Sequence, residues 1–274
     1  MKADWGSSYR LVAAEKWKLQ SAAMGRGVTE ALVKYAQPSL GMRVLDLASG
    51  TGEPAISLAG LVGPKGMVTA LDLSAELLKI ASTRAHQRRL PNLSLCQGDA
   101  HRLPFRDQTF DLASCRFGVM FFAQVDVAFA ELHRVLQPGG RACFAAWGPF
   151  EQPYWQSTIG IVVKHLGGAP LDRHGQDPFC FDEPARLQAA LSRAGFRQTE
   201  SFRQNVPWTW FGTADEVWHY VQAVSTPFRP LLECVPQSKW PLINAEVHSA
   251  VASYIQGDRI EFGAEIVLAS GKRT

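Results

Sequence analysis

Short apolar runs alternate with amphipathic segments through the first half of the chain. The apolar runs are Arg43–Leu47, Met67–Leu71, Leu93–Gln97, Phe110–Ser114 and Arg141–Ala146. The amphipathic segments between them are Pro54–Leu61, Ala75–Arg89 and Val125–Leu136. This strand–helix alternation predicts a parallel sheet with helices on both faces. Right-handed crossovers place the carboxyl ends of such strands along one edge of the sheet, where ligands bind.

The pattern is less regular beyond residue 147. A helix is predicted at Leu187–Gly195, with Asp182 as its N-terminal cap and Pro184 in its first turn. Two further strands are predicted at Phe196–Phe202 and Ile260–Ser270. The expected fold class is therefore α/β, with a seven-stranded, mostly parallel sheet whose last strand runs antiparallel.

The stretch Thr213–Gly257 is helical and aromatic in character, and prolines at 227, 230, 236 and 241 break it into pieces. We interpret it as part of a helical cap inserted into the main domain. The predicted organisation is an N-terminal helical lid over residues 1–40, a core formed by 41–204 and 259–274, and a substrate cap over 205–258.

Composition agrees with a soluble globular protein, since hydrophobic residues make up 46% and charged residues 19% of the chain. The net charge is +3, with 17 Lys and Arg against 12 Asp and Glu in residues 1–150 and 11 against 13 in the remainder. A nucleic-acid enzyme would concentrate its basic residues in a stripe. The densest basic patch, Arg84 to Arg89, is interpreted as a solvated helix end, so no nucleic-acid partner is expected.

The five cysteines are odd in number, widely spaced and never arranged as CxxC, which favours neither a disulfide framework nor a zinc site. Three of them, Cys96, Cys115 and Cys143, lie in apolar strand-like runs, where a cysteine behaves as a small hydrophobe. The first ten residues hold no apolar signal core, and no apolar run is long enough to span a membrane. We therefore expect a cytoplasmic protein without a metal site, and a homodimer is left open.

The strongest local pattern runs from Val44 to Ala55, where an apolar strand ends in a glycine loop and Pro54 follows at the start of a helix. Gly50 and Gly52 let the backbone turn tightly and approach a ligand closely. The spacing Gly50-x-Gly52-x-x-Ala55 also satisfies a dinucleotide fingerprint. An NAD-dependent oxidoreductase is therefore one alternative for this loop.

Three acidic residues lie at or near strand ends and favour a different ligand. Asp46 lies inside the first strand, directly before the glycine loop, where a cationic ligand suits it better than a pyrophosphate. Asp72 ends the second strand at the position that holds a ribose diol, and Asp99 follows the third strand, within reach of an adenine amino group. An acid-lined pocket of this kind suits a sulfonium nucleoside that carries an amino acid.

A set of sequence stretches then gives a family resemblance. VLDLASGTGEPA, ALDLS, GDAHRLPF, FDLASCRFGVMFF and RVLQPGGR follow one another between Gly41 and Trp147. In their order and spacing they resemble the class I S-adenosylmethionine-dependent methyltransferases, and within them the UbiE-like (ubiquinone/menaquinone C-methyltransferase-like) group. The resemblance implies a Rossmann-like fold, S-adenosyl-L-methionine as cofactor, and transfer of a methyl group to a small molecule.

The resemblance also implies residue roles. Gly50 and Gly52 would line the methionine moiety, Asp72 would bind the ribose hydroxyls, and Asp99 with the Ala100 amide would bind adenine. The full set of expected cofactor-binding residues is Asp46, Ala48, Ser49, Gly50, Gly52, Asp72, Leu73, Asp99, Ala100, Cys115 and Arg116.

Two positions depart from the wider family. Ala48 stands where the family usually has the first glycine of its loop. Ser114-Cys115-Arg116-Phe117 stands where amino-methylating DNA enzymes carry an (Asn/Asp)-Pro-Pro-aromatic motif, which argues against methylation of DNA bases.

Plainer interpretations stay open for several of these residues. Asp72 could cap the helix that begins near Ser74, and Asp99 could be a turn residue. Arg116 could pair with an acid at the sheet edge or meet a substrate carbonyl or carboxylate. Pro138-Gly139-Gly140 is expected to be a structural turn that leads into the fifth strand.

Methyl transfer from a sulfonium is an in-line displacement with a good, neutral leaving group, so positioning supplies much of the catalysis. A general base is needed only where the acceptor atom keeps a proton. Among seven histidines, His219 is the candidate for that role, and no catalytic residue is assigned.

Six of the eight tryptophans fall from residue 147 onward. They could form the core beneath a helical lid, or a pocket for a flat, lipophilic acceptor. Phe117, Trp147 and Trp17 are the expected substrate-binding residues. The predicted function is methylation of O, C or N of a small aromatic or lipophilic metabolite, with a catalytically silent S-adenosylmethionine-binding module as a further alternative.

Overall fold

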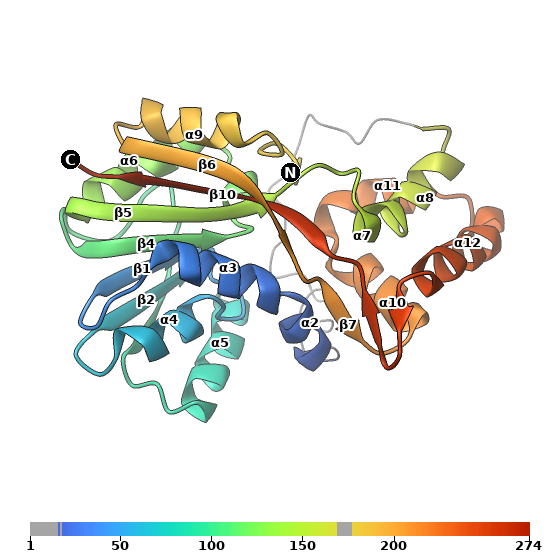
Figure 1. Cartoon of the computed structure of the whole chain (residues 1–274), viewed down its shortest axis with the longest axis horizontal. Helices are drawn as coiled ribbons and strands as arrows, with labels where there is room; N and C mark the ends of the chain where they lie inside the picture. Colours follow the sequence, from blue (N-terminus) through green and yellow to red (C-terminus); the bar gives the residue numbers. More distant parts are fainter. Residues whose placement is uncertain (1–15, 17, 169–176) are drawn as a thin grey trace. The chain divides into compact units, whose positions relative to one another are not determined.

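The structure of the chain is a computed structural model that describes residue 16 and residues 18–168 and 177–274 (Figure 1). The described residues group into two compact units. The core unit comprises Val28–Gly148, Cys180–Gln204 and Ile266–Thr274. The aromatic unit comprises the described residues up to Gly27, together with those of Pro149–Phe179 and Asn205–Glu265.

The core unit is built on a seven-stranded sheet with the order β3-β2-β1-β4-β5-β10-β6. The first five of these strands pair in parallel, whereas β10 pairs with β5 in the antiparallel sense, as predicted. The strands are β1 (Arg43–Leu47), β2 (Met67–Asp72), β3 (Leu93–Gln97), β4 (Phe110–Arg116), β5 (Leu136–Trp147), β6 (Arg197–Val206) and β10 (Ala264–Lys272).

Helices cover both faces of this sheet (Figure 1). The helices α4 and α5 pack on β1, β2 and β3, whereas α6 and α9 pack on each other on the opposite face. The elements are α3 (Arg26–Ala36), α4 (Ala55–Val62), α5 (Ala75–Gln87), the 3₁₀ helix η1 (Val119–Phe121), α6 (Val125–Val135) and α9 (Pro184–Arg193). Because both faces of the central strands are covered, most residues of β1 and β4 are buried.

The register of the sheet determines what lies at its ligand-binding edge. Leu47, the last residue of β1, lies beside Leu71 of β2 and Cys115 of β4. The carboxyl ends of three strands therefore meet side by side, and these strand ends together with the loops that follow them carry most of the expected cofactor-binding residues. The helix α5 starts at this edge, where the Ser74 hydroxyl accepts a hydrogen bond from the backbone N–H of Leu77.

The aromatic unit combines short helices with a three-stranded sheet of order β7-β9-β8. Its elements are α2 (Lys18–Met24), α7 (Pro153–Gln156), α8 (Ile159–His165), β7 (Thr209–Phe211), α10 (Ala214–Val224), η2 (Thr226–Phe228), α11 (Arg229–Glu233), η3 (Gln237–Lys239), α12 (Trp240–Ala252), β8 (Ile255–Gln256) and β9 (Arg259–Glu261). Pro227, Pro230 and Pro241 lie in the first turns of η2, α11 and α12, where a missing N–H costs nothing.

The tryptophans of this unit form its core. Trp210 and Trp218 are fully buried, and the ring of Tyr154 makes edge contacts with Trp155 and Trp208 at centroid distances of 4.8 and 5.5 Å. Of the two roles expected for the tryptophans after residue 147, a core or a substrate pocket, these residues have the first.

Several predicted elements need correction. The single strand predicted at Ile260–Ser270 is two strands, β9 and β10, because Gly263 between them adopts a left-handed φ of 68°. The helix α9 starts at Pro184 rather than Leu187 and has Glu183 at its N-cap position. Asp182 is not the cap: its carboxylate accepts from the adjacent Glu183 N–H.

The predicted turn Pro138–Gly140 lies inside β5. Along β4, the paired residue of β5 shifts from Leu136, opposite Phe110, to Arg141, opposite Leu112. Pro138–Gly140 therefore lie in an irregular, bulge-like stretch within β5 and not in a turn before it. Within the described residues, no helix is long and apolar enough to cross a membrane.

Candidate functional site

The glycine loop after β1 turns by means of left-handed residues. Ala48, Gly50 and Gly52 have φ values of 52°, 54° and 110°. A Cβ at Gly52 would lie 2.6 Å from the Ile56 side chain, so only glycine fits there. A Cβ at Gly50 would meet no atom within 4 Å, which leaves the backbone open on that side of the loop.

Asp72, at the end of β2, holds this loop in place. Its Oδ2 accepts a hydrogen bond of 2.8 Å from the Gly50 N–H, and its Oδ1 accepts one of 2.9 Å from the Ser74 N–H. The cap of α5 is Ser74 itself, so the carboxylate links the glycine loop to the helix start. Each carboxylate oxygen keeps a lone pair for a further donor, such as a ribose hydroxyl.

Asp46 is a fully buried carboxylate beneath the loop. Its Oδ1 accepts a short hydrogen bond of 2.6 Å from the Ser114 hydroxyl of β4. Its Oδ2 is buried and has no hydrogen-bond partner among the described residues. Burial raises the pKa of Asp46 to about 7, against the opposing effects of the Ser114 hydroxyl and the Arg116 charge. A buried carboxylate oxygen without a partner suits a cationic ligand, so the residues fit S-adenosylmethionine.

The Ala48 methyl group lies against Gly118, a glycine that the sequence did not single out. A Cβ at Gly118, after β4, would lie 2.4 Å from the Ala48 Cβ and 2.8 Å from the Cys115 Sγ. The left-handed backbone at Ala48 aims its methyl group at this position. Gly118 therefore makes room for the alanine that replaces the family's usual glycine.

The substitution Gly118→Ala is expected to lower the free energy of unfolding by about 2 kcal/mol, the typical cost of overpacking. Backbone strain plays no part, because φ at Gly118 is −98°. Adding Ala48→Gly should recover part of the loss, since it removes one of the two clashing atoms. Urea denaturation of the single and double variants measures both effects, and an additive double variant would contradict the contact.

Asp99 and Ala100 follow β3. Oδ1 of Asp99 accepts from the His101 backbone N–H at 2.9 Å and lies 2.6 Å from His101 Nδ1. The Gln124 N–H donates to His101 Nε2 at 3.1 Å, so the proton of the neutral ring is assigned to Nδ1, where it is donated to Asp99. His101 thus ties the expected adenine-binding segment to the start of α6.

The segment after β4 supplies Cys115, Arg116 and Phe117. Cys115 is fully buried, and burial raises the pKa of its thiol. Arg116 donates from Nη1 to the Thr29 hydroxyl of α3 at 2.8 Å, and its charge acts on Asp46. Arg116 is therefore hydrogen-bonded to Thr29 and lowers the pKa of Asp46, and both residues belong to the core unit.

Phe117 and Trp147 are brought together by the parallel strands β4 and β5. Their rings stack at a centroid distance of 4.3 Å with an interplanar angle of 12°. Phe117 has a left-handed φ of 57°, a conformation that bulky residues seldom adopt outside functional sites. Phe117 directly follows β4 and Trp147 is the last residue of β5, so both rings lie at the edge that carries the glycine loop.

Other expected residues lie in different surroundings. Ser49 is buried and donates to the Asp46 carbonyl, Ala100 is buried, and Leu73 is 54% exposed next to Asp72. His219 lies on α10 in the aromatic unit, with Nδ1 3.0 Å from the Asp215 carboxylate.

Trp17 lies outside the described residues. The described part of the chain contains no group of three or more His, Cys, Asp or Glu side chains suited to a metal ion. Ser114 and Gly118 were missed, although a hydroxyl inside an apolar strand and a glycine directly after it are the signals that mark them.

Comparison with known proteins finds methyltransferases. A family model described as a methyltransferase domain matches residues 44–140. A demethylmenaquinone methyltransferase of Staphylococcus carnosus is 32% identical over 179 residues, which cover 62% of this chain and 73% of that protein. Its counterpart from Chlorobaculum parvum is 43% identical over 170 residues, 58% of this chain and 68% of that protein.

Solved structures agree at the level of fold. The YcgJ protein of Bacillus subtilis has a TM-score of 0.57 at 22% identity, with 89% of this chain and 97% of that chain covered. None of the comparisons supports the dinucleotide alternative for the glycine loop. The chain belongs to the class I S-adenosylmethionine-dependent methyltransferases, in the UbiE-like group.

Proposed function

We propose that this methyltransferase acts on carbon, oxygen or nitrogen of a small aromatic or lipophilic acceptor, with quinols as the first compounds to test. The observation that carries the proposal is the stacked pair of Phe117 and Trp147 at the carboxyl ends of β4 and β5. Flat apolar rings beside a charged cofactor loop favour a flat apolar acceptor. The names of the relatives, which are demethylmenaquinone methyltransferases, point in the same direction.

The bound S-adenosylmethionine supplies an activated methyl group. We propose that Asp72 holds the ribose, that Asp99 and the Ala100 amide bind the adenine, and that Gly50 and Gly52 border the amino-acid part. Asp46 is buried beneath the glycine loop, and its ionised form would favour a cation nearby. The contribution of the protein is then to hold the acceptor atom in line with the methyl group, which supplies much of the rate enhancement.

The test is a methyl-transfer assay with isotopically labelled S-adenosylmethionine and a reduced naphthoquinone acceptor. The wild type should transfer label, and Phe117→Ala should lower kcat/KM for the acceptor about 10-fold, since it removes one stacked ring. Affinity for S-adenosylhomocysteine, measured by calorimetry, should change less than about threefold because Phe117 is not an anchor of the nucleoside.

Phe117→Tyr is the matched control, because it keeps the ring and should keep most of the activity. Equal losses of cofactor affinity and acceptor turnover in Phe117→Ala would contradict the acceptor role. No transfer to any flat or lipophilic acceptor, with cofactor binding intact, would favour the catalytically silent binding module.

The remaining expectations belong with this proposal. A small-molecule acceptor fits the family, whereas the absence of a nucleic-acid partner, the homodimer and the cytoplasmic location stay predictions. The roles of residues 1–40 as a lid and 205–258 as a substrate cap stay predictions as well. His219 stays a weak candidate for a general base.

A further inference from the structure

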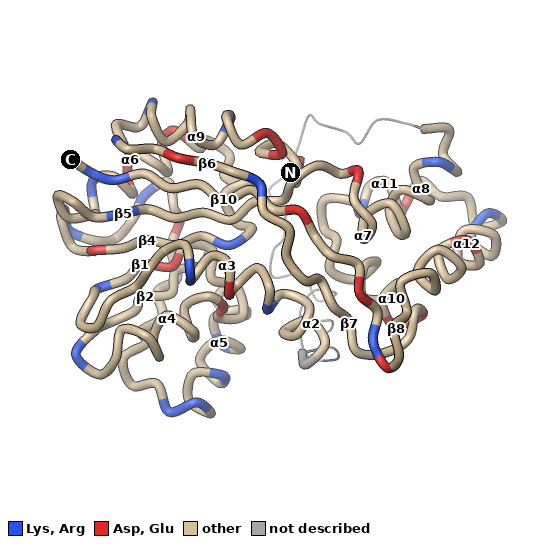
Figure 2. The backbone as a smooth tube through the Cα atoms, in the orientation of Figure 1, with Lys and Arg blue, Asp and Glu red and all other residues tan. Residues whose placement is uncertain are grey.

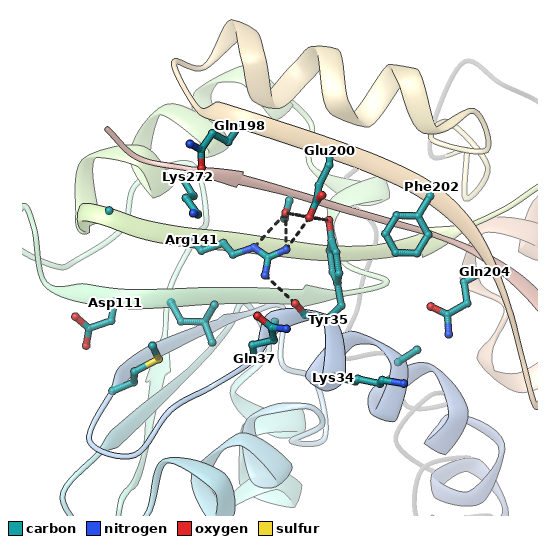
Figure 3. A pocket seen from close by; sticks show the side chains of 16 residues that line it. Lys34, Tyr35, Gln37, Asp111, Arg141, Gln198, Glu200, Phe202, Gln204 and Lys272 are labelled. Atoms are coloured by element: carbon teal, nitrogen blue, oxygen red, sulfur yellow. Dashed lines mark hydrogen bonds and ion pairs between the residues drawn. The ribbon is translucent and has the colours of Figure 1, made fainter.

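The core unit carries a cavity away from its expected cofactor-binding residues. It has a volume of about 720 Å³ and is lined by α3, the loop after it, and strands β4, β5, β6 and β10 (Figure 3). Asp111 and Leu112 are among the first residues of β4, so the cavity lies at the amino ends of the parallel strands. The cofactor-binding residues lie at the carboxyl ends. A volume of this size is typical of small-molecule sites.

The floor of the cavity is a fixed hydrogen-bond network. The Arg141 guanidinium donates to the Tyr35 carbonyl at 2.8 Å, to Glu200 Oε1 at 2.9 Å and to the Ser270 hydroxyl at 2.9 Å. The Tyr35 hydroxyl donates to the same carboxylate oxygen at 3.0 Å. Burial raises the pKa of Tyr35 to about 12, so the phenol keeps its proton. Arg141 and Glu200 thus neutralise each other and hold three strands and a helix in register.

Two lysines around this floor have no such partner. Lys34 and Lys272 are exposed, and neither makes an ion pair or a side-chain hydrogen bond with a residue that the structure describes. Figure 3 shows them on opposite sides of the Arg141 network. Of the acids that line the cavity, Glu200 is paired with Arg141, whereas Asp111 accepts from the backbone N–H of Arg43 and keeps its charge. The lining therefore has three basic side chains against two acidic ones, a net charge of +1.

The rest of the lining is amphiphilic. The Phe202 ring is 41% exposed and meets the Tyr35 ring edge-on at 5.3 Å. Three glutamines, Gln37, Gln198 and Gln204, line the cavity, and their amides make no hydrogen bond with a described residue. Gln37 and Gln198 adopt left-handed φ values of 51° and 49°. At Gln37 this is the ordinary end of helix α3, whereas Gln198 adopts it within β6.

We propose that this cavity is a second binding site, for a small organic anion with an aromatic or otherwise apolar body. Lys34 and Lys272 would attract the carboxylate, sulfonate or phosphate group, and the glutamine amides offer donors to its oxygens. The exposed face of Phe202 would contact the apolar body. The site is independent of the acceptor proposed above, and each can fail without the other.

The test uses 1-anilinonaphthalene-8-sulfonate, a fluorescent aromatic anion, titrated into the full chain with excess S-adenosylhomocysteine present. The double variant Lys34→Glu/Lys272→Glu should weaken its binding at least about 10-fold, since contacts to a charged group are worth that much or more. The matched control, Lys65→Glu/Lys79→Glu, makes the same charge change at exposed lysines outside the cavity and should shift the affinity less than about twofold.

A second probe separates charge from packing. N-Phenyl-1-naphthylamine has the same rings without the sulfonate, so its affinity should be the same in the wild type and both double variants. Equal losses in the two lysine pairs, or no loss in either, would overturn the proposal. A difference in mass by light scattering between the wild type and Lys34→Glu/Lys272→Glu would also overturn it, because the cavity would then be a contact between copies of the chain.

Discussion

Asp72→Ala is expected to weaken the binding of S-adenosylmethionine and S-adenosylhomocysteine at least about 100-fold, because hydrogen bonds to a charged group contribute about 1.5–3 kcal/mol each. In our proposal this carboxylate accepts both ribose hydroxyls. It also accepts from the Gly50 and Ser74 N–H groups, so its removal frees the glycine loop from the end of β2. Titration calorimetry with both ligands measures the loss.

A ligand without the two hydroxyls distinguishes these causes. The 2′,3′-dideoxy analogue of S-adenosylhomocysteine should bind the wild type weakly, and Asp72→Ala should change its affinity little if the ribose contact dominates. A large further loss with this analogue would assign the effect to the loop instead. Glu76→Ala is the matched control, because Glu76 is an exposed acid in the first turn of the same helix. It should leave binding within about twofold.

The sequence predicted the parallel strands of the core unit closely. β1 and β3 have the predicted bounds, and β4 differs by two residues. Most residues of β1 and β4 are buried, which leaves these strands little freedom in length. β3 is a half-exposed edge strand, and its bounds follow from the strand–helix alternation. The acids at the strand ends were predictable for a related reason. In a parallel sheet, adjacent strands end together, so Asp72 and the glycine loop had to meet.

Other features depend on contacts that no local pattern contains. The fit between Ala48 and Gly118 joins residues seventy positions apart and depends on the φ of each. The hydrogen bond from Ser114 to Asp46 crosses two strands whose register is set by the whole sheet. The strands β7 and β8 have three and two residues, too few for a period-two pattern to be seen.

The cavity near Arg141 could not be predicted at all. It arises because β6, β10 and β5 present alternate side chains on a face that α9 does not cover. Figure 2 shows Lys and Arg spread over many elements of the chain, and no sequence run marks the two lysines of the cavity. Lys34 on α3 and Lys272 on β10 are far apart in the sequence and line the same cavity only in the folded chain.

Asp46 should make the stability of the ligand-free protein fall as the pH rises from about 4 to about 7. Its folded-state pKa is about 7, above its ordinary value of 3.8, so the folded chain holds this proton more tightly than the unfolded chain does. The stabilisation is complete below the unfolded pKa and is lost as the pH rises through the folded pKa. The expected loss is on the order of 4 kcal/mol.

Asp46→Asn isolates this contribution from those of other titrating groups. The free energy of unfolding of the variant relative to the wild type should rise by that amount between pH 4 and pH 8, as measured by urea denaturation. The Ser114 hydroxyl favours the charged carboxylate, so Ser114→Ala should raise the pKa of Asp46 further. The free energy of unfolding of this variant should therefore keep decreasing to a higher pH than that of the wild type. In the Asp46→Asn background Ser114→Ala should add no pH dependence. A pH-independent difference between Asp46→Asn and the wild type would contradict the raised pKa.

The same titration should appear in cofactor binding. A sulfonium near the carboxylate favours its ionised form, so binding of S-adenosylmethionine below pH 7 should release the proton of Asp46. Affinity for S-adenosylmethionine should therefore rise with pH to about 7 and then level off, whereas S-adenosylhomocysteine, which lacks the sulfonium charge, should depend on pH less. Asp46→Asn should abolish the difference between the two ligands. If both ligands keep the same pH profile in wild type and variant, Asp46 acts only on the fold and does not sense the methyl donor.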